Sequence, residues 1–127
     1  MSLKTLRLVS TALVLTLAVT SFAFAAKSKA AGKGDAAAGK AIFTAKCVAC
    51  HKADGSGGVK LTGNPTPNWK DPKTWADPKR KDADAYLRDC ITHGKIKSGM
   101  VAWGDTKQLK PADIDNVIAY IFTLKKK

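Results

Sequence analysis

Glutamate is absent from this 127-residue sequence, so aspartate supplies all ten acidic side chains, against 22 lysines and arginines. Histidine occurs twice, and methionine occurs once after the initiator, so few imidazole and thioether groups are present as metal ligands. No segment alternates apolar and polar residues in the manner of a β-strand, and no segment is repeated. The absence of strand patterns counts against a sheet-based fold, and the length allows a single domain.

An uncharged segment follows a short basic start at the N-terminus. Lys4 and Arg7 precede the apolar run Leu8–Ala26, in which Ala23–Ala25 has the small-x-small pattern that signal peptidase recognises. Residues 1–25 are therefore predicted to be a cleaved signal peptide, and cleavage would leave 102 residues. The alternative is an uncleaved membrane anchor, because 19 uncharged residues are just long enough to span a bilayer.

Export determines how the positive charge is interpreted. Loss of the signal peptide removes two cations and lowers the formal net charge from +12 to +10. An exported protein, expected in the periplasm or otherwise outside the cytoplasm, rarely meets nucleic acid, and the lysines are scattered along the chain. The charge is therefore expected to keep the protein soluble or to steer encounters with acidic protein patches.

Three helices separated by two loops are predicted in residues 35–127, after a flexible basic segment at 26–34. Asp35 is the expected N-cap of a helix that runs to about Cys47, and Asp82 or Asp84 caps a second helix that ends near Gly94. Pro111 begins the last helix. Apolar residues recur along that helix with a helical period at Ile114, Val117, Ile118, Ile121 and Leu124. The expected fold is all-α, with about three to four helices and long loops at 52–82 and 95–109.

The motif Cys47-Val48-Ala49-Cys50-His51 carries the strongest chemical signal. C-x-x-C-H is the attachment signature of haem c. Two thiols one helical turn apart can add to the two vinyl groups on one edge of a porphyrin, and the adjoining imidazole then lies beneath the iron. So few helices for such long loops also fit a fold wrapped around a central cofactor, here one covalently bound haem.

Two other interpretations use the same cysteines. A thioredoxin-like redox pair requires a strand-to-helix junction, which the sequence does not predict. A structural zinc site could combine Cys47 and Cys50 with Cys90 and His93, whose spacing is acceptable for tetrahedral coordination. The zinc site would leave His51 without a role.

The chain resembles a class I c-type cytochrome, a mono-haem electron carrier, from Gly34 to about Leu124. Gly39–Phe43 resembles the first helix of that family, and Ile118–Ile121 resembles its C-terminal helix, which packs against the first. The family places a methionine ligand in the loop before the last helix, where this chain has Ser98–Gly104. The resemblance implies a cytochrome c fold, with His51 and Met100 as the two iron ligands.

Met100 is also singled out by its own position. Methionine usually fills gaps in cores, but this one follows Gly99 in a loop and is the only thioether after the initiator. His93, the one other histidine, is the competing sixth ligand; the alternative for His93 is a helix-end residue whose charge suits the helix dipole. Cys90 shares a helix face with Tyr86 and Leu87 and is expected to be a small buried apolar side chain rather than a surface thiol that forms a dimer.

The resemblance raises further expectations for the surroundings of the haem. A loop proline carbonyl, from Pro65 or Pro67, would accept a hydrogen bond from the haem-ligating imidazole. Three tryptophans (Trp69, Trp75 and Trp103) would line the haem edge or simply fill the core. Arg88 and Lys97 would face the propionates or remain on the surface. The lysines expected near the exposed haem edge are Lys46, Lys52, Lys60, Lys95 and Lys97.

The predicted function is an exported mono-haem c-type cytochrome that carries one electron between redox partner proteins and is not an enzyme. The expected partners have acidic docking patches, and the protein is expected to be a monomer without a membrane span after signal cleavage. One alternative is a haem subunit tethered in a larger respiratory complex. The other is a haem peroxidase or ligand-binding protein, which applies if Met100 is not the sixth ligand.

Overall fold

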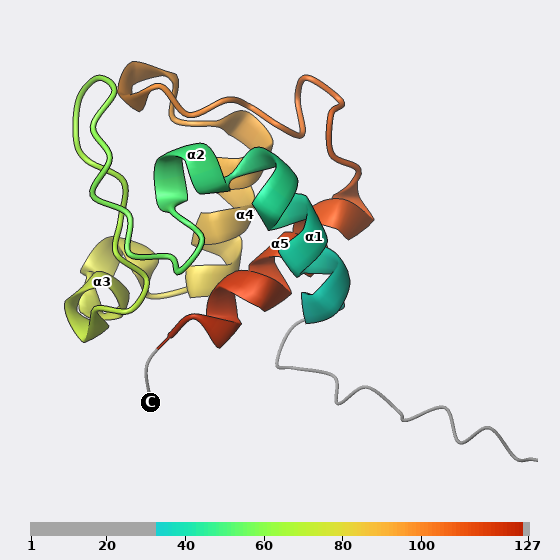
Figure 1. Ribbon diagram of the computed structural model, residues 1–127, viewed down its shortest axis with the longest axis horizontal. Coiled ribbons are helices and arrows are strands. Elements are labelled where there is room, and N and C mark those ends of the chain that lie inside the picture. Colours follow the sequence, from blue (N-terminus) through green and yellow to red (C-terminus); the bar gives the residue numbers. More distant parts are fainter. Residues whose placement is uncertain (1–32, 126–127) are drawn as a thin grey trace, which may run out of the picture.

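The computed structural model describes residues 33–125, and within them the chain is helical. The elements are α1 (Ala36–Lys46), α2 (Val48–His51), α3 (Pro72–Ala76), the 3₁₀ turn η1 (Pro78–Arg80), α4 (Ala83–His93), the 3₁₀ turn η2 (Ile96–Ser98) and α5 (Pro111–Thr123) (Figure 1). No strand occurs among the described residues, which agrees with the predicted all-α fold. The predicted signal peptide at 1–25, and all but the last two residues of the basic segment 26–34, lie outside them.

The predicted helix ends are confirmed by their capping contacts. The Asp35 carboxylate accepts hydrogen bonds from the backbone N–H groups of Ala37 and Ala38 at 2.7 and 3.3 Å, which satisfies donors that the first turn of α1 leaves free. Of the two candidates for the next long helix, Asp82 is the N-cap of α4. Gly94 ends α4 with φ 69°, and Pro111 is the first residue of α5.

The expectation of an unstructured loop from 52 to 82 is wrong at its C-terminal end, where α3 and η1 form. Each begins with an aspartate followed by a proline. The carboxylates of Asp71 and Asp77 cap these elements by accepting from the N–H groups of Lys73 and Lys79, each at 2.9 Å. A proline at the first helical position loses no hydrogen bond, so the two Asp-Pro pairs are the signal that the sequence analysis missed.

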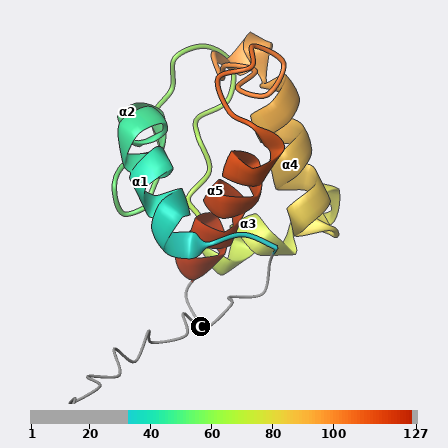
Figure 2. The same ribbon diagram turned by 90° about the vertical axis from the view of Figure 1, so that its right-hand side faces the viewer.

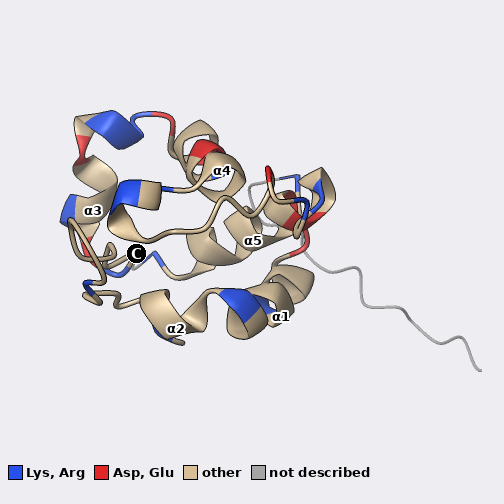
Figure 3. Cartoon of the chain, turned by 90° about the horizontal axis from the view of Figure 1, so that it is seen from above, with Lys and Arg blue, Asp and Glu red and all other residues tan. Residues whose placement is uncertain are grey.

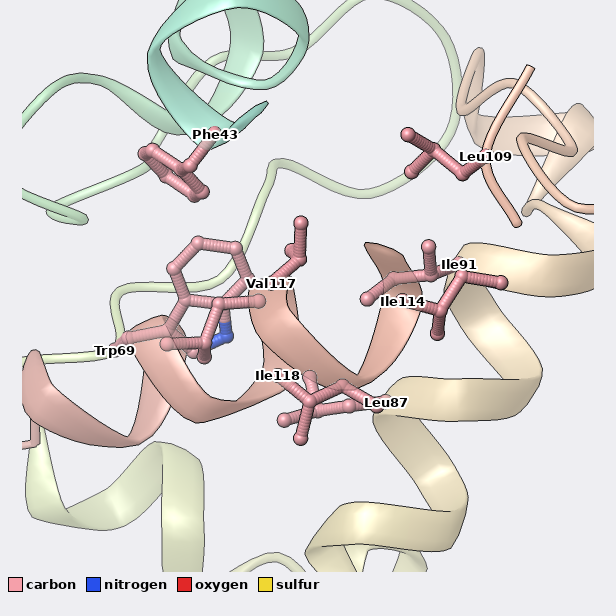
Figure 4. Packing of buried hydrophobic residues seen from close by; sticks show 9 residues of the cluster. Phe43, Trp69, Leu87, Ile91, Leu109, Ile114, Val117 and Ile118 are labelled. Carbon is pink, nitrogen blue, oxygen red and sulfur yellow. The ribbon is translucent and has the colours of Figure 1, made fainter. Parts of the chain in front are cut away.

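The tightest packing joins the two ends of the fold, where α1 crosses α5 (Figures 1 and 2). Gly39 makes this approach possible: a Cβ at that position would lie 1.9 Å from the carbonyl oxygen of Asn116. The adjoining core contains Phe43, which is 1% exposed. α4 packs against α5 as well, and its Leu87 and Ile91 join the same core (Figure 4).

Four of the five apolar residues predicted for the last helix are buried in this core: Ile114, Val117, Ile118 and Ile121. The fifth, Leu124, is half-buried and packs against it. Within residues 33–125, no helix has the length and apolar character needed to cross a membrane.

Candidate functional site

A cavity of about 370 Å³ lies between α2, the loop that follows it, α4 and the loop that precedes α5. Its volume is in the range of small-molecule and cofactor sites. Cys47, Cys50, His51 and Met100, the four residues that the sequence singled out as a site, all line it. The chain thus brings the C-x-x-C-H motif of α2 and the thioether of a distant loop to one cavity.

The short helix α2 positions the motif. The carbonyl of Cys47 accepts hydrogen bonds from the N–H groups of Cys50 and His51 at 3.2 and 2.9 Å, so the motif forms a single helical turn. Both thiols are half-buried. Burial raises the pKa of the Cys47 thiol to about 11, although the nearby Lys46 opposes the shift, so the thiol is protonated at neutral pH.

His51 is buried, with 7% of the residue exposed, and burial lowers its pKa to about 4. The imidazole is therefore neutral at physiological pH, which is the form that binds metals. Its Nδ1 atom is buried and has no hydrogen-bond partner within residues 33–125. The expected bond from Nδ1 to the carbonyl of Pro65 or Pro67 is thus not formed. The Pro67 carbonyl instead faces Gly57, where a Cβ would lie 2.1 Å from its oxygen.

Met100 lies in a loop that is anchored at both ends. Its N–H and carbonyl both bond to Lys95, which closes the turn that contains η2. Beyond Met100, the N–H groups of Trp103 and Asp105 donate to the carbonyls of Ile91 and Thr92 at 3.0 Å, which fastens the loop to the end of α4. Met100 is half-buried and packs against the core, as an inward-facing side chain does.

His93 does not line the cavity. It is 60% exposed, and its Nδ1 pairs with the Asp105 carboxylate at 2.9 Å. The structure thus contradicts both alternatives that used it, namely a sixth ligand to iron and a fourth zinc ligand. Within the described residues, no cluster of three or more histidine, cysteine or acidic side chains could hold a metal ion.

Cys90 is buried as predicted, at 7% exposure, and its side chain lies on the cavity wall.

The three tryptophans have different roles. Trp69 and Trp103 line the cavity. Trp75 does not: its indole N–H donates to the carbonyl of Trp69 at 2.7 Å, and its ring stacks on Phe122. Trp75 therefore supports Trp69 from outside the cavity and does not line it.

Of the lysines expected near the haem edge, Lys46 and Lys95 line the cavity, whereas the two cations expected at the propionates do not. Arg88 is held by Asp84 and Asp115 at 3.1 and 2.7 Å, and neither Arg88 nor Lys97 lines the cavity. The lining cations are Lys46, Arg80 and Lys95, and the lining set contains no carboxylate. Arg80 was missed because it lies in η1, where no element was predicted. A wall with three cations and no acid is electrostatically suited to an anionic ligand.

Residues 34–121 match a protein family described as cytochrome C oxidase, cbb3-type, subunit III. Cytochrome c-555 of Chlorobaculum thiosulfatiphilum is 33% identical over 88 residues, which cover 68% of this chain and 93% of that protein. Cytochrome c6 of a Picosynechococcus species is 38% identical over 119 residues, which cover 87% of this chain and 88% of that protein.

Proposed function

The chain belongs to the class I c-type cytochromes, and we propose that it carries single electrons between redox partner proteins through one haem bound in the cavity described above. A covalently attached haem c is the cofactor of this family. When bound, the haem supplies a one-electron couple between ferric and ferrous iron. Electron transfer between other proteins, rather than enzymatic turnover, is the activity of such a protein.

The observation that carries the proposal is the convergence of four groups on one cavity. These are two thiols one turn apart, a neutral imidazole whose Nδ1 has no partner among the described residues, and a thioether from another segment. In the proposal, the Cys47 and Cys50 thiols each add S–H across a vinyl double bond, with no leaving group. His51 and Met100 would hold the iron, and a thioether ligand would raise the reduction potential.

Arg80 and Lys95 are proposed to face the two propionate groups. Their charged ends lie 5.3 and 5.7 Å from the centre of the Tyr86 ring, and all three residues line the cavity. Arg80 is additionally fixed by a 2.6 Å hydrogen bond from its Nη1 to the carbonyl of Thr74. A cation held in place by its neighbours loses little side-chain entropy when it binds a carboxylate.

The docking face is proposed to be the rim of the cavity. Leu61 and Val101 line the cavity and are also 58% and 40% exposed, so they mark its opening. Ile96, 69% exposed, belongs to the same loop as Val101. Lys60 precedes Leu61 in the sequence, and Lys95 and Lys97 flank Ile96. Lysines and arginines also occur on several other elements of the fold (Figure 3). An apolar patch with a basic border fits a redox partner with an acidic border around its own docking patch.

The proposal that the protein is exported is based on its sequence. Residues 1–25 are proposed to be a signal peptide, followed by a basic N-terminal segment at 26–34 and the cytochrome domain at 35–127. The mature protein is then periplasmic, or otherwise exported, and monomeric.

The match to a cytochrome oxidase subunit favours a second candidate, a haem subunit tethered in a respiratory complex by an uncleaved N-terminus. N-terminal sequencing of the native protein distinguishes the two candidates, because only the first begins near residue 26.

The experiment that tests the proposal is haem staining after denaturing electrophoresis, combined with intact-protein mass spectrometry. The protein is produced in a host that attaches haem c, and the wild-type band is expected to stain and to gain the mass of one haem. Cys47→Ala and Cys50→Ala remove one thioether each, and His51→Ala is expected to abolish maturation. Cys90→Ala is the matched control, because it removes the third thiol of the cavity wall and should still stain. A colourless wild-type band overturns the proposal.

A further inference from the structure

The imidazole of His51 lies nearly flat against the indole of Trp69. The ring centroids are 4.5 Å apart, and the ring planes differ by 17°. Both residues line the cavity, and they are only 7% and 5% exposed. Because His51 belongs to α2 and Trp69 to the segment before α3, the stack is a tertiary contact and not a product of local chain geometry.

Trp69 is held by contacts that do not involve His51. Its N–H donates to the carbonyl of Gly55 at 2.9 Å, and its carbonyl accepts from the indole of Trp75 at 2.7 Å. Its ring also packs at a 60° tilt against Phe43, with 5.8 Å between the centroids. Figure 4 shows the indole between Phe43 of α1 and Val117 of α5. The indole therefore presents a fixed flat surface to the cavity.

His51 has no comparable polar restraint. Its Nδ1 is without a hydrogen-bond partner in the described structure, and neither candidate proline carbonyl reaches it. The torsion that rotates an imidazole about its Cβ–Cγ bond has a broad energy profile, so packing decides the ring plane. Phe43 contacts the imidazole at a 45° tilt and a centroid distance of 6.5 Å, whereas Trp69 is closer and nearly parallel.

We propose that Trp69 is a positioning residue that sets the plane of the His51 imidazole toward the haem. This inference rests on the proposed function, in which His51 is an axial ligand. The same stack has an electrostatic consequence, because the face of an indole is electron-rich and attracts positive charge. Positive charge on the ligating imidazole is greater in the oxidised protein. Trp69 therefore also favours the oxidised state and lowers the reduction potential.

The first test uses the haem-loaded wild-type protein and needs no substitution. In NMR spectra of the reduced protein, nuclear Overhauser effects are expected between the ring protons of His51 and the indole protons of Trp69. Their absence would overturn the inference even if a Trp69 variant failed to fold. A wild-type protein that binds haem without His51 as a ligand would contradict the proposed function together with this inference. A His51-ligated haem without the contact contradicts the inference alone.

The second test compares variants by electron paramagnetic resonance of the oxidised protein and by redox titration. Trp69→Leu removes the flat ring and is expected to shift the principal g values and raise the reduction potential. Trp69→Phe keeps an aromatic face and is expected to retain g values near those of the wild type. Tyr120→Leu is the control, since it removes an aromatic ring that contacts Phe43 but belongs neither to the stack nor to the cavity wall. Unchanged g values in Trp69→Leu, or an equal shift in Tyr120→Leu, would overturn the inference.

Discussion

Lys95 and Met100 exchange two backbone hydrogen bonds, each N–H donating to the other residue's carbonyl, at 3.1 and 3.2 Å. This pair closes a turn in which Ile96 and Lys97 are exposed, whereas Ser98 and Met100 line the cavity. The Lys95 side chain is tied to α4 by Asp89 at 3.0 Å. The thioether is therefore presented by a turn that is fixed to the fold at its base.

Gly94 is the residue at which α4 meets the Met100 turn. It has φ 69°, and a Cβ there would lie 2.6 Å from the Met100 carbonyl oxygen and 2.7 Å from the backbone nitrogen of Ala102. Gly94→Ala is therefore expected to combine backbone strain of about 1–2 kcal/mol with overpacking of about 1–3 kcal/mol. The control is Gly58→Ala, which has a similar positive φ of 80° but no atom within 4 Å of the new Cβ. Denaturant unfolding should show a clearly larger loss for Gly94→Ala, and equal losses would refute the role of the contact.

Two single substitutions test whether Met100 or His93 is the second ligand of the iron. Met100→Ala is expected to lower the reduction potential and to abolish the weak absorption band near the red end of the oxidised spectrum, because the thioether ligand is lost. His93→Ala is expected to change neither property, because that side chain is exposed and paired with Asp105. Redox titration followed by absorption spectroscopy measures both. The assignment fails if the Met100→Ala spectrum is that of the wild type.

The crossing of α1 and α5 depends on Gly39. An alanine methyl there would collide with the Asn116 carbonyl oxygen at 1.9 Å, and backbone on both sides would have to move. Gly39→Ala is expected to destabilise the protein by about 1–3 kcal/mol, although alanine is the better helix former. Ala41→Gly, at an exposed position of the same helix, is expected to cost only about 1 kcal/mol. Thermal unfolding of both variants measures the difference, and a stabilised Gly39→Ala would show that the helices do not pack this closely.

Asp54 and Lys70 form an ion pair of 2.8 Å at the base of the loop that ends in Trp69. The hydrogen bond from Lys70, together with those from Ser56, holds the pKa of the Asp54 carboxyl well below its ordinary 3.8. Because this carboxyl binds protons more weakly in the folded state, its contribution to stability is complete above pH 3.8. The contribution is lost as the pH falls through the lower folded-state pKa.

Asp54→Asn should therefore reduce the melting temperature at pH 5–6 and have a shrinking effect as the pH approaches 2. Thermal unfolding over that pH range is the measurement, and Lys70→Met should give the same trend. The effect is expected to be small, since the carboxylate is exposed to solvent. If the loss of melting temperature in Asp54→Asn stayed constant down to pH 2, the ionised carboxylate would not be its cause.

The rim of the cavity is expected to control encounters with anionic reactants. Lys60 precedes Leu61 and Lys97 precedes Ser98, and both Leu61 and Ser98 line the cavity. Lys95 forms an ion pair with Asp89. Reversing both charges, in Lys60→Glu/Lys97→Glu, is expected to slow oxidation of the reduced protein by ferricyanide roughly tenfold at low ionic strength. The wild-type rate should fall with added salt, because the screening length is about 8 Å at physiological ionic strength.

The control for the rim is Lys40→Glu/Lys73→Glu, which makes the same change in net charge at two exposed positions whose neighbours in the sequence do not line the cavity. Stopped-flow absorbance measures the rate constants. Equal slowing in the two double variants would mean that overall charge, and not the rim, governs the encounter.

Much of the fold and half of the candidate site follow from short-range chemistry. Asp35, Asp82 and Gly94 delimit helices because a carboxylate satisfies free N–H groups and a glycine accepts positive φ, and both effects act within a few residues. The C-x-x-C-H motif is equally local, since its three functional side chains fit on the single turn formed by α2 and its N-cap residue Cys47. Asp71 and Asp77 obey the same rules, so α3 and η1 were within reach of the sequence.

The rest was decided by contacts between distant segments. The sequence favoured Met100 over His93 through its loop position and the family resemblance, but which side chain faces the cavity depends on how the turn closed at Lys95 packs on the end of α4. Arg88 does not line the cavity because it forms ion pairs with Asp84 of its own helix and with Asp115 of α5, whereas Arg80 does line it. The stack of Trp69 on His51 likewise exists only after the loop has folded over α2. Local propensities act along the chain, whereas the orientation of each side chain in the cavity is selected by close packing against residues that become neighbours only in the folded protein.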